Sequence, residues 1–241
     1  MDTSMERIVP DQLDLGDSFD RLSYELHLER YRFASRLLPA GRILDMACGA
    51  GYGIHGLASL EKFQQSRFTG VDISAETIDY ARRRYAHPGI QYIRSDVLDY
   101  TDEHPYDGIV SLETIEHLKD PAAFVQKLYG LLRPGGILVV SAPVTPSTDG
   151  NPFHLSDYSE QSFRRLFPPQ LFTETEKLLQ VQPYALSGVM GSKKNKRISG
   201  IRDHILKFYL IHPRLFFMRL VSLLKNGFTN KYLTLALERK I

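Results

Sequence analysis

The sequence predicts an α/β fold built on a mostly parallel, doubly wound sheet. Short apolar runs alternate with segments of helical periodicity between residues 42 and 143, and such alternation is typical of parallel sheets covered on both faces. Two runs, GIVSL at 108–112 and GILVVSA at 136–142, are almost continuously apolar, as expected for strands buried on both faces. A chain of 241 residues can bury one sizeable core, so we expect one domain with additions.

Each element follows from a local pattern. A first helix is expected at 19–38, ended by Pro39 and Gly41. Strands are expected at 42–47, 68–73, 90–96, 106–113 and 136–143, with helices near 52–60, 75–86 and 121–132 between them. The RPGG sequence is interpreted as a turn before the fifth strand, and strands at 174–184 and 230–240 complete the sheet. The loop at 143–158, dense in Pro, Asn, Asp and Ser, is predicted to be a functional lid.

The composition excludes several classes of protein. The chain is 43% hydrophobic and 24% charged, which is ordinary for a soluble globular protein. Cys48 is the only cysteine, so there is no internal disulfide framework and a reducing compartment is expected. The eight histidines lack metal-ligand spacing, so no metal is predicted. No apolar segment with a cleavage site lies near the N-terminus, and we therefore expect a cytoplasmic location.

Charge is distributed unevenly along the chain. Residues 190–241 hold twelve Lys or Arg against two acidic residues, whereas the rest has a net charge of −8. Within this basic part, residues 200–226 are rich in Leu and Phe, but basic residues and Pro213 interrupt every apolar run before the roughly 20 residues that span a bilayer. Three roles stay open: contact with the inner face of a membrane, cover for a hydrophobic substrate, and packing on the chain itself or in a homodimer. Nucleic-acid binding is not expected, because no recognised module accompanies the basic residues.

The segment ILDMACGAGYG, Ile43–Gly53, joins the first strand to a glycine-rich turn. Gly51, Gly53 and Gly56 match the dinucleotide pattern G-x-G-x-x-G, which several cofactor folds share. Asp45 separates the alternatives, because a carboxylate here gains little beside a pyrophosphate but stabilises a cationic ligand. S-adenosylmethionine carries a sulfonium and an ammonium and no phosphate, so the pattern favours it over NAD.

Acidic residues also end the next three predicted strands, where open α/β sheets bind ligands. Asp72 is placed to accept hydrogen bonds from two ribose hydroxyls, worth about 3 kcal/mol together. Asp96 can accept from an adenine amine while the Val97 amide meets a ring nitrogen. Glu113 is expected beside the amino-acid end of the ligand.

These motifs resemble those of class I S-adenosylmethionine-dependent methyltransferases, in the broad small-molecule group. The resemblance covers about residues 20–165 and rests on LDMACGAGYG, GVDIS, SDVLDY, SLETIEHLKDP and LLRPGG in this order and spacing. It implies a Rossmann-like, seven-stranded, mostly parallel sheet with an antiparallel last strand. Together with the pattern along the rest of the chain, this predicts a single methyltransferase domain over 1–241, with an N-terminal helical cap at 1–40, a cofactor-binding core at 41–187, a basic hydrophobic helical insertion at 188–227 and the last strand at 228–241.

The predicted cofactor site combines this pattern with the resemblance, which places Gly49 and Gly51 beside the methionine portion. Its residues are Asp45, Ala47, Cys48, Gly49, Gly51, Tyr52, Asp72, Ile73, Asp96, Val97, Glu113 and His117. Within it, Cys48 is interpreted as a small packing residue and not as a nucleophile. For Gly56, close helix–strand packing is favoured over ligand contact.

A general base would assist methyl transfer to a hydroxyl acceptor, and two histidines are catalytic candidates. His117 follows the fourth strand. In the resembling family this histidine occurs in enzymes that act on different substrates, so the alternative to a general base is a local structural role or contact with the cofactor. His154 lies in the lid sequence NPFHLSDYS, where either a loop-stabilising hydrogen bond or substrate contact explains it. Tyr158 of the same loop is a substrate-binding candidate.

The first helix carries four polar or aromatic residues on an apolar element: Tyr24, His27, Arg30 and Tyr31. They either cap the cofactor pocket or form a solvated face. Tyr24 and Tyr31 are seven residues apart and share one face, and Tyr24 is our candidate for substrate binding from this helix.

The sequence therefore predicts methyl transfer to an O or N atom of a small-molecule acceptor. The lid resembles those of methyltransferases of bacterial sugar, polysaccharide and secondary-metabolite pathways, which favours a sugar-containing or lipid-linked acceptor. A quinone- or lipid-type methyltransferase at the membrane surface and a non-catalytic, cofactor-binding regulatory protein are the alternatives.

Overall fold

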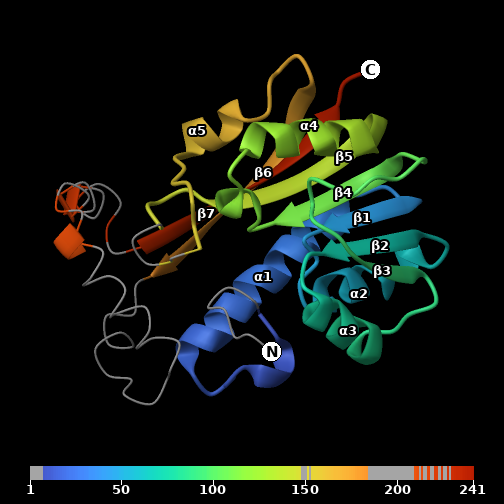
Figure 1. Cartoon of the computed structure of the whole chain (residues 1–241), viewed down its shortest axis with the longest axis horizontal. Helices are drawn as coiled ribbons and strands as arrows, with labels where there is room; N and C mark the ends of the chain where they lie inside the picture. Colours follow the sequence, from blue (N-terminus) through green and yellow to red (C-terminus); the bar gives the residue numbers. More distant parts are fainter. Residues whose placement is uncertain are drawn as a thin grey trace.

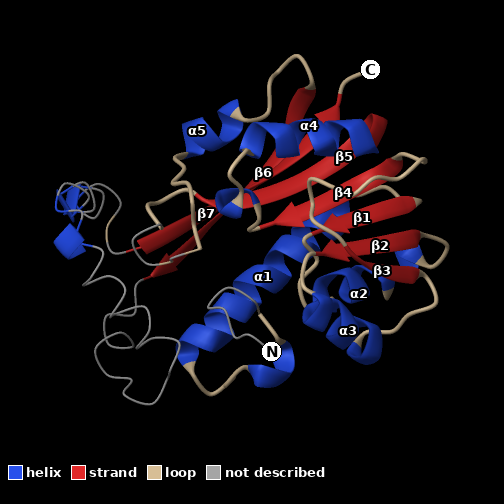
Figure 2. Cartoon of the chain, viewed as in Figure 1, coloured by secondary structure: helices blue, strands red, loops and turns tan. Residues whose placement is uncertain are grey.

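A seven-stranded sheet forms the centre of the computed structural model, with helices on both faces (Figure 1, Figure 2). The structure describes residues 8–147, 151, 153–183 and 229–241, and ten positions between 209 and 227. The strands are β1 (Arg42–Met46), β2 (Arg67–Asp72), β3 (Ile90–Arg94), β4 (Tyr106–Leu112), β5 (Leu132–Pro143), β6 (Phe172–Pro183) and β7 (Thr229–Arg239).

The strand order is β3-β2-β1-β4-β5-β7-β6. The pairs from β3 to β5 are parallel, and β7 is antiparallel to both β5 and β6. This confirms the predicted doubly wound, seven-stranded sheet with an antiparallel last strand. Because β2 and β4 leave β1 on opposite sides, the chain reverses its winding at β1, and ligands of such sheets bind at this switch point.

The helices are α1 (Ser18–Leu37), α2 (Tyr52–Ala58), α3 (Ala75–Arg84), α4 (Pro121–Leu131) and α5 (Glu160–Arg165), with 3-10 turns η1 (Pro10–Gln12), η2 (Glu61–Phe63) and η3 (Ile115–His117). Two hydrophobic clusters separate the two faces of the sheet. One holds buried residues of α4 and α5, and the other those of α1, α2 and α3. The cofactor-type turn after β1 therefore lies on the side that α1 covers.

Two local predictions need correction. Helix α5 was not expected; Ser159 and Ser162 form a capping box at its start, and this pattern is the signal that the sequence offered. The RPGG sequence is not a separate turn, because β5 already begins at Leu132. Tyr106 pairs with Leu132 and Gly108 with Ile137, so the extra residues of β5 bulge out of the ladder, with Gly135 at a φ of 70°.

The insertion predicted at 188–227 falls largely outside the described residues. The positions described between 209 and 224 are helical, in agreement with the expected helix. Within the part of the chain that the structure describes, no helix is both long enough and apolar enough to cross a membrane.

Helix α1 packs directly on α2 because Gly53 has no side chain. A Cβ at Gly53 would lie less than 3.0 Å from three carbon atoms of the Tyr31 ring, whereas a Cβ at Gly56 would meet nothing within 4 Å. The predicted packing role of a glycine in this helix therefore belongs to Gly53, and the prediction for Gly56 is wrong.

We expect Gly53→Ala to lower the free energy of unfolding by about 1–3 kcal/mol, because the buried Tyr31 ring has to move. Gly56→Ala, in the same helix, is the matched control and should raise it by up to about 1 kcal/mol through helix propensity. Urea unfolding followed by circular dichroism measures both. Equal effects of the two substitutions would show that Tyr31 does not constrain this position.

Candidate functional site

The carboxylates predicted from the strand ends meet at one edge of the sheet. Asp45, one residue before the end of β1, pairs with Gly70 of β2 and Val110 of β4. Asp72 ends β2, and Glu113 directly follows β4. The structure thus brings the predicted acidic residues together from neighbouring strands, at the edge where α1 and the loop after β5 also lie (Figure 1).

The turn after β1 holds its backbone in a conformation that few side chains adopt. Ala47, Gly49 and Gly51 have φ angles of 70°, 53° and 85°. A Cβ on Gly51 would lie 2.8 Å from Cβ of Ala81, so Gly51 permits close packing on α3. Among the residues that the structure describes, nothing lies within 4 Å of the Cβ position of Gly49, so a ligand can approach the backbone there. A non-glycine residue at positive φ, such as Ala47, is typical of a functional site.

Asp45 is buried, with 1% of its surface exposed. The Tyr31 hydroxyl donates a hydrogen bond of 2.9 Å to its Oδ2 atom, whereas its Oδ1 atom has no hydrogen-bond partner among the described residues. Burial raises the pKa of Asp45 to about 7, although the Tyr31 hydrogen bond lowers it; the charge of Asp72 raises it further. A buried acceptor without a donor costs free energy, so a cationic ligand with N–H groups fits here.

Asp72 joins the first two loops of the site. Its Oδ2 atom accepts a hydrogen bond of 3.2 Å from the Gly49 amide, and its Oδ1 atom accepts one of 2.9 Å from the Ser74 amide. A carboxylate offers about four acceptor positions, so these bonds are compatible with additional ones to a ribose. The neighbouring Ile73 is 57% exposed and forms an apolar surface beside the carboxylate.

Asp96 organises the loop after β3. Its Oδ1 atom accepts a hydrogen bond of 2.8 Å from the Leu98 amide, and its carbonyl oxygen accepts one from the Tyr100 amide. The Val97 side chain is buried in the core. Both residues thus stabilise the loop in the structure. The adenine contacts that the sequence predicts for them stay a prediction.

Glu113 is held by a hydroxyl and a buried cation. Its φ of 49° is again unusual for a non-glycine residue. Its Oε1 atom accepts a hydrogen bond of 2.6 Å from Ser141 and lies 3.8 Å from a guanidinium nitrogen of Arg30. Arg30 is 2% exposed, donates to Gln180 at 2.8 Å and lies over the Tyr232 ring. Arg30 is therefore not on a solvated face, and that alternative is wrong.

Ser141 and Gln180 were missed in the sequence. Each is a polar residue in a strand, at positions where apolar neighbours surround it. A buried polar side chain needs a partner, so an isolated polar residue in a buried strand was the available signal. The partners, Glu113 for Ser141 and Arg30 for Gln180, lie more than twenty residues away in the sequence, so local patterns could not identify them.

The remaining residues of α1 form an aromatic cluster above the glycine-rich turn. Tyr24 and Tyr31 both contact the Tyr52 ring, with centroid distances of 5.5 and 6.2 Å. His27 Nδ1 lies 2.8 Å from the Tyr52 hydroxyl, and burial together with the Arg30 charge lowers the pKa of His27 to about 3. This neutral histidine and the three tyrosines cover the turn, as the cap interpretation expects.

Cys48 lies in the hydrophobic cluster beneath α1, 4% exposed. Its sulfur is close to Gly70, where a Cβ would lie 3.0 Å away. This agrees with its interpretation as a packing residue.

The two catalytic candidates meet where the lid crosses η3. The His117 and His154 rings contact each other edge to face, with centroids 4.8 Å apart. The lid is anchored beside them, because the amides of Leu155 and Ser156 donate to the Glu116 carbonyl oxygen at 2.8 and 3.3 Å. The fold therefore brings the two histidine rings into contact, although they are far apart in the sequence.

Tyr158 lies deeper than the rest of the lid. It is 8% exposed and packs against Phe163 of α5, with ring centroids 5.9 Å apart, and burial raises its pKa. These contacts favour a packing role over the substrate contact that the sequence suggests.

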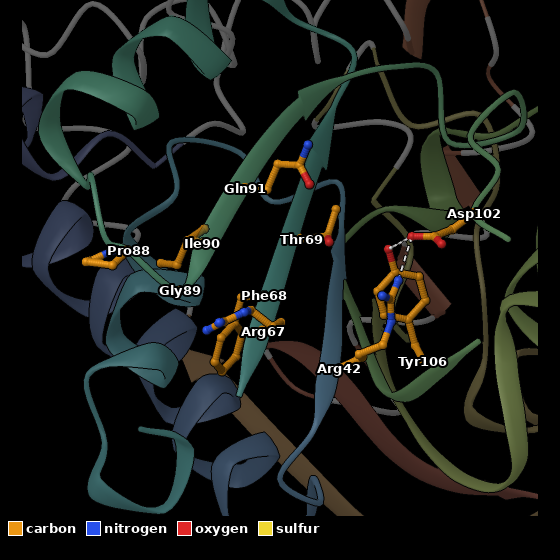
Figure 3. Close-up of a pocket in the computed structure, with 10 residues that line it drawn as sticks. All are labelled: Arg42, Arg67, Phe68, Thr69, Pro88, Gly89, Ile90, Gln91, Asp102 and Tyr106. Carbon is orange, nitrogen blue, oxygen red and sulfur yellow. Dashed lines mark hydrogen bonds and ion pairs between the residues drawn. The ribbon is translucent and has the colours of Figure 1, made fainter. Parts of the chain in front are cut away.

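A pocket of about 430 Å³ lies at the opposite edge of the sheet (Figure 3). Its lining includes Arg42, Arg67 and Ile90, which begin β1, β2 and β3. Arg42 is bound there by Asp102 at 2.8 Å. Because open α/β sheets bind ligands at the carboxyl ends of their strands, we assign the site to the edge with Asp45 and not to this pocket.

Comparison with known proteins identifies the domain. Residues 44–140 match the family described as methyltransferase domain. Over these residues the chain is similar to S-adenosylmethionine-dependent methyltransferases, as the motifs at the strand ends predict. S-adenosylmethionine is accordingly the cofactor of this methyltransferase domain.

Two of the curated relatives are similar over about half of this chain. A protein of Mycolicibacterium smegmatis named "Probable S-adenosylmethionine-dependent methyltransferase" is 34% identical over 134 residues, 53% of this chain and 50% of that protein. A ubiquinone biosynthesis O-methyltransferase of Xylella fastidiosa is 36% identical over 124 residues, 49% of each. The chain thus spans about half the length of the curated relatives it matches.

A solved structure shows the same fold. The N-methyltransferase NodS from Bradyrhizobium japonicum, in complex with S-adenosylhomocysteine, superposes with a TM-score of 0.59 at 17% identity. The match covers 98% of this chain and 94% of NodS.

The residues of the methyltransferase domain fit its cofactor. The buried Oδ1 atom of Asp45 has no donor in the described part of the chain, and the cofactor carries a cationic amino group. The space beside Gly49 admits the ligand to the backbone, and Asp72 offers acceptors next to it.

The raised pKa of Asp45 makes the stability of the methyltransferase domain depend on pH. Because this pKa rises from 3.8 to about 7 on folding, the folded state binds the extra proton between these values. The resulting stability is fully present below about pH 4 and is lost as the pH rises through about 7, by up to about 4 kcal/mol.

The side chain of Asp45→Asn stays neutral at every pH. As the pH rises from about 4 to about 8, we therefore expect the free energy of unfolding of this variant to fall less than that of the wild type. Urea unfolding across this range measures the difference. Asp99→Asn, at an exposed position, is the control and should follow the wild type. Parallel curves for the wild type and Asp45→Asn would contradict the prediction.

Proposed function

We propose that the protein transfers a methyl group from S-adenosylmethionine to an O or N atom of a small-molecule acceptor. The observation that carries the proposal is Asp45, a buried carboxylate with one oxygen lacking a donor, at a glycine-rich turn of a class I methyltransferase domain. Such a group suits a cationic cofactor and not a pyrophosphate.

The residues of the chain have separate tasks in this proposal. Asp45 binds the ammonium group, Asp72 accepts hydrogen bonds from the ribose, and Asp96 with the Val97 amide recognises the adenine. When bound, S-adenosylmethionine supplies a methyl group on a positively charged sulfur. The acceptor lone pair forms a bond to the methyl carbon, while the carbon–sulfur bond breaks and its electron pair remains on sulfur.

Positioning accounts for much of the rate in such a displacement, on the order of 7–11 kcal/mol. In this proposal the aromatic cluster of α1, whose rings contact Tyr52 beside the turn, shields the reacting groups from water. The lid approaches from the other side, with His154 and His117 facing each other. We therefore propose that the acceptor binds between α1 and this pair of histidines.

The polar lid favours an acceptor that carries hydroxyl groups, such as a sugar-containing or lipid-linked intermediate. Ser147 and Asp157 interact at 2.7 Å through the Ser147 amide, and His154 Nδ1 lies 2.7 Å from the Ser147 hydroxyl. A surface of this kind offers both donors and acceptors to hydroxyls.

Calorimetric titration with S-adenosylhomocysteine tests the cofactor site. We expect the wild type to bind it and not to bind NAD, and Asp72→Asn to bind it at least about tenfold more weakly. Asp79→Asn, exposed on the outer face of α3, is the control and should bind as the wild type does. Binding of NAD instead, or equal affinities for all three proteins, would contradict the assignment of Asp72.

Transfer of labelled methyl groups from S-adenosylmethionine into fractions of a cell extract tests the reaction itself. Label in an organic acceptor that depends on Asp72 supports the enzyme. Tight binding of S-adenosylhomocysteine without any transfer would instead support a regulatory, cofactor-binding protein.

A second candidate is a quinone- or lipid-type methyltransferase at a membrane surface. One relative is a ubiquinone biosynthesis O-methyltransferase. Large apolar side chains are also exposed at the described helical positions between 209 and 224, among them Leu210 at 84%, Phe217 at 65% and Leu224 at 80%. The surrounding segment is strongly basic, and a basic helix with exposed apolar residues suits an anionic lipid surface.

Flotation with vesicles tests this candidate. We expect the wild type to float with phosphatidylglycerol vesicles more than with phosphatidylcholine vesicles, and the double variant Phe217→Ser and Leu224→Ser to lose this binding, because buried apolar area is removed. Leu60→Ser, at an exposed apolar position after α2, is the control. Equal flotation of the double variant and the wild type would exclude this helix as a membrane contact.

A further inference from the structure

Three potential metal ligands meet at the junction of η3 and the lid. Glu116 and His117 belong to η3 and His154 to the lid, and one ligand atom from each lies within 4.8 Å of the others. Glu116 is fully buried, whereas both histidines are partly exposed. The sequence concealed the group, because 37 residues separate the two histidines and no ligand spacing results.

The hydrogen bonds around the two rings favour metal binding through the same nitrogen of each. His117 Nδ1 lies 3.0 Å from the Phe153 carbonyl oxygen, which only accepts, so Nδ1 carries the proton and the lone pair is on Nε2. A backbone carbonyl on the second nitrogen is the usual support of a metal-binding histidine.

His154 has the equivalent support through a side-chain relay. Its Nδ1 lies 2.7 Å from the Ser147 hydroxyl, and that hydroxyl donates to Asp157 at 3.4 Å. With the Ser147 proton directed to Asp157, His154 donates through Nδ1 and again presents Nε2. Two histidines oriented this way beside a buried carboxylate are more specific than a cluster of acidic residues.

We propose that Glu116, His117 and His154 bind one divalent transition-metal ion of the Zn²⁺ or Co²⁺ type. Two imidazoles and one carboxylate suit such ions better than they suit Mg²⁺, which prefers oxygen ligands. Ligand atoms of a tetrahedral ion lie about 3.4 Å apart, given metal–nitrogen distances of about 2.0–2.1 Å. The observed ligand atoms lie within 4.8 Å of one another, so a small adjustment of side chains brings them to this spacing. Three protein ligands leave a fourth position for water or substrate.

The metal position indicates the class of acceptor. Residue Glu113, next to the predicted amino-acid end of the cofactor, is only three residues from Glu116. An ion at this junction would bind an acceptor hydroxyl and lower its pKa, and the hydroxyl proton would pass to water as the oxygen attacks the methyl carbon. This part of the inference rests on the proposed methyl transfer and favours an O-acceptor over an N-acceptor. Metal binding itself does not depend on it.

Titration of Co²⁺ into the full, untagged chain after removal of bound metal with a chelator tests the site. We expect one Co²⁺ per chain, with the visible absorption of a low-coordinate ion, and displacement by Zn²⁺. His154→Ala and Glu116→Gln should each weaken Co²⁺ binding by at least about tenfold. His104→Ala, in the exposed turn before β4, is the matched control and should bind as the wild type does. Thermal unfolding checks that each variant is folded; His154 lies in the lid, so its substitution spares the core.

Equal Co²⁺ binding by the wild type and His154→Ala, or no binding by the wild type, would overturn the metal site. Parallel titration with S-adenosylhomocysteine separates this from the proposed function. Cofactor binding without Co²⁺ binding would refute only the metal site, and Co²⁺ binding without cofactor binding would refute only the proposed methyl transfer.

Discussion

The hydrogen bond from Tyr31 to Asp45 is the contact on which the arrangement of the site depends. It joins the cap helix α1 to the end of β1 at 2.9 Å, in a space that exists only because Gly53 has no side chain. Burial raises the pKa of the Tyr31 hydroxyl as well as that of Asp45, so ionisation of Asp45 inside the fold costs stability. A cationic group beside the second carboxylate oxygen would offset this cost. The domain thus keeps an unfavourable buried group at the place where we propose that the cationic cofactor binds.

A second set of contacts converts three separate loops into one surface. Asp72 ties the glycine-rich turn to the start of α3 through two backbone amides. Glu113, at a positive φ, is held by Ser141 of β5 and by Arg30 of α1. Arg30 also donates a hydrogen bond to Gln180 of β6. Helix α1 is therefore held both at the end of β4 and at β6. The Arg30–Gln180 hydrogen bond is buried and the other three are partly buried, so they are more costly to break than similar bonds on the open surface.

The lid completes the site from the opposite side. Its backbone is bound to the carbonyl oxygen of Glu116, and its histidine contacts His117. The predicted cofactor residues lie at strand ends, whereas the proposed acceptor region combines the lid with helix α1. This division explains why the family could be recognised from the cofactor motifs, while the acceptor has to be inferred from the few polar groups of the lid.

The sequence by itself determined the sheet and the identity of the cofactor edge. Apolar runs such as GILVVSA and the acids Asp45 and Asp72 at strand ends are local patterns, and strands of a parallel sheet deliver their carboxyl ends to one edge. It did not determine the short helix α5, whose six residues carry too few turns for periodicity, or the start of β5 within RPGG. Only the tertiary structure decided the contacts of Tyr31 with Asp45, of Arg30 with Gln180 across 150 residues, and of His117 with His154. These contacts depend on how helices and loops pack on the sheet, and local periodicity carries no information about which distant side chains that packing brings together.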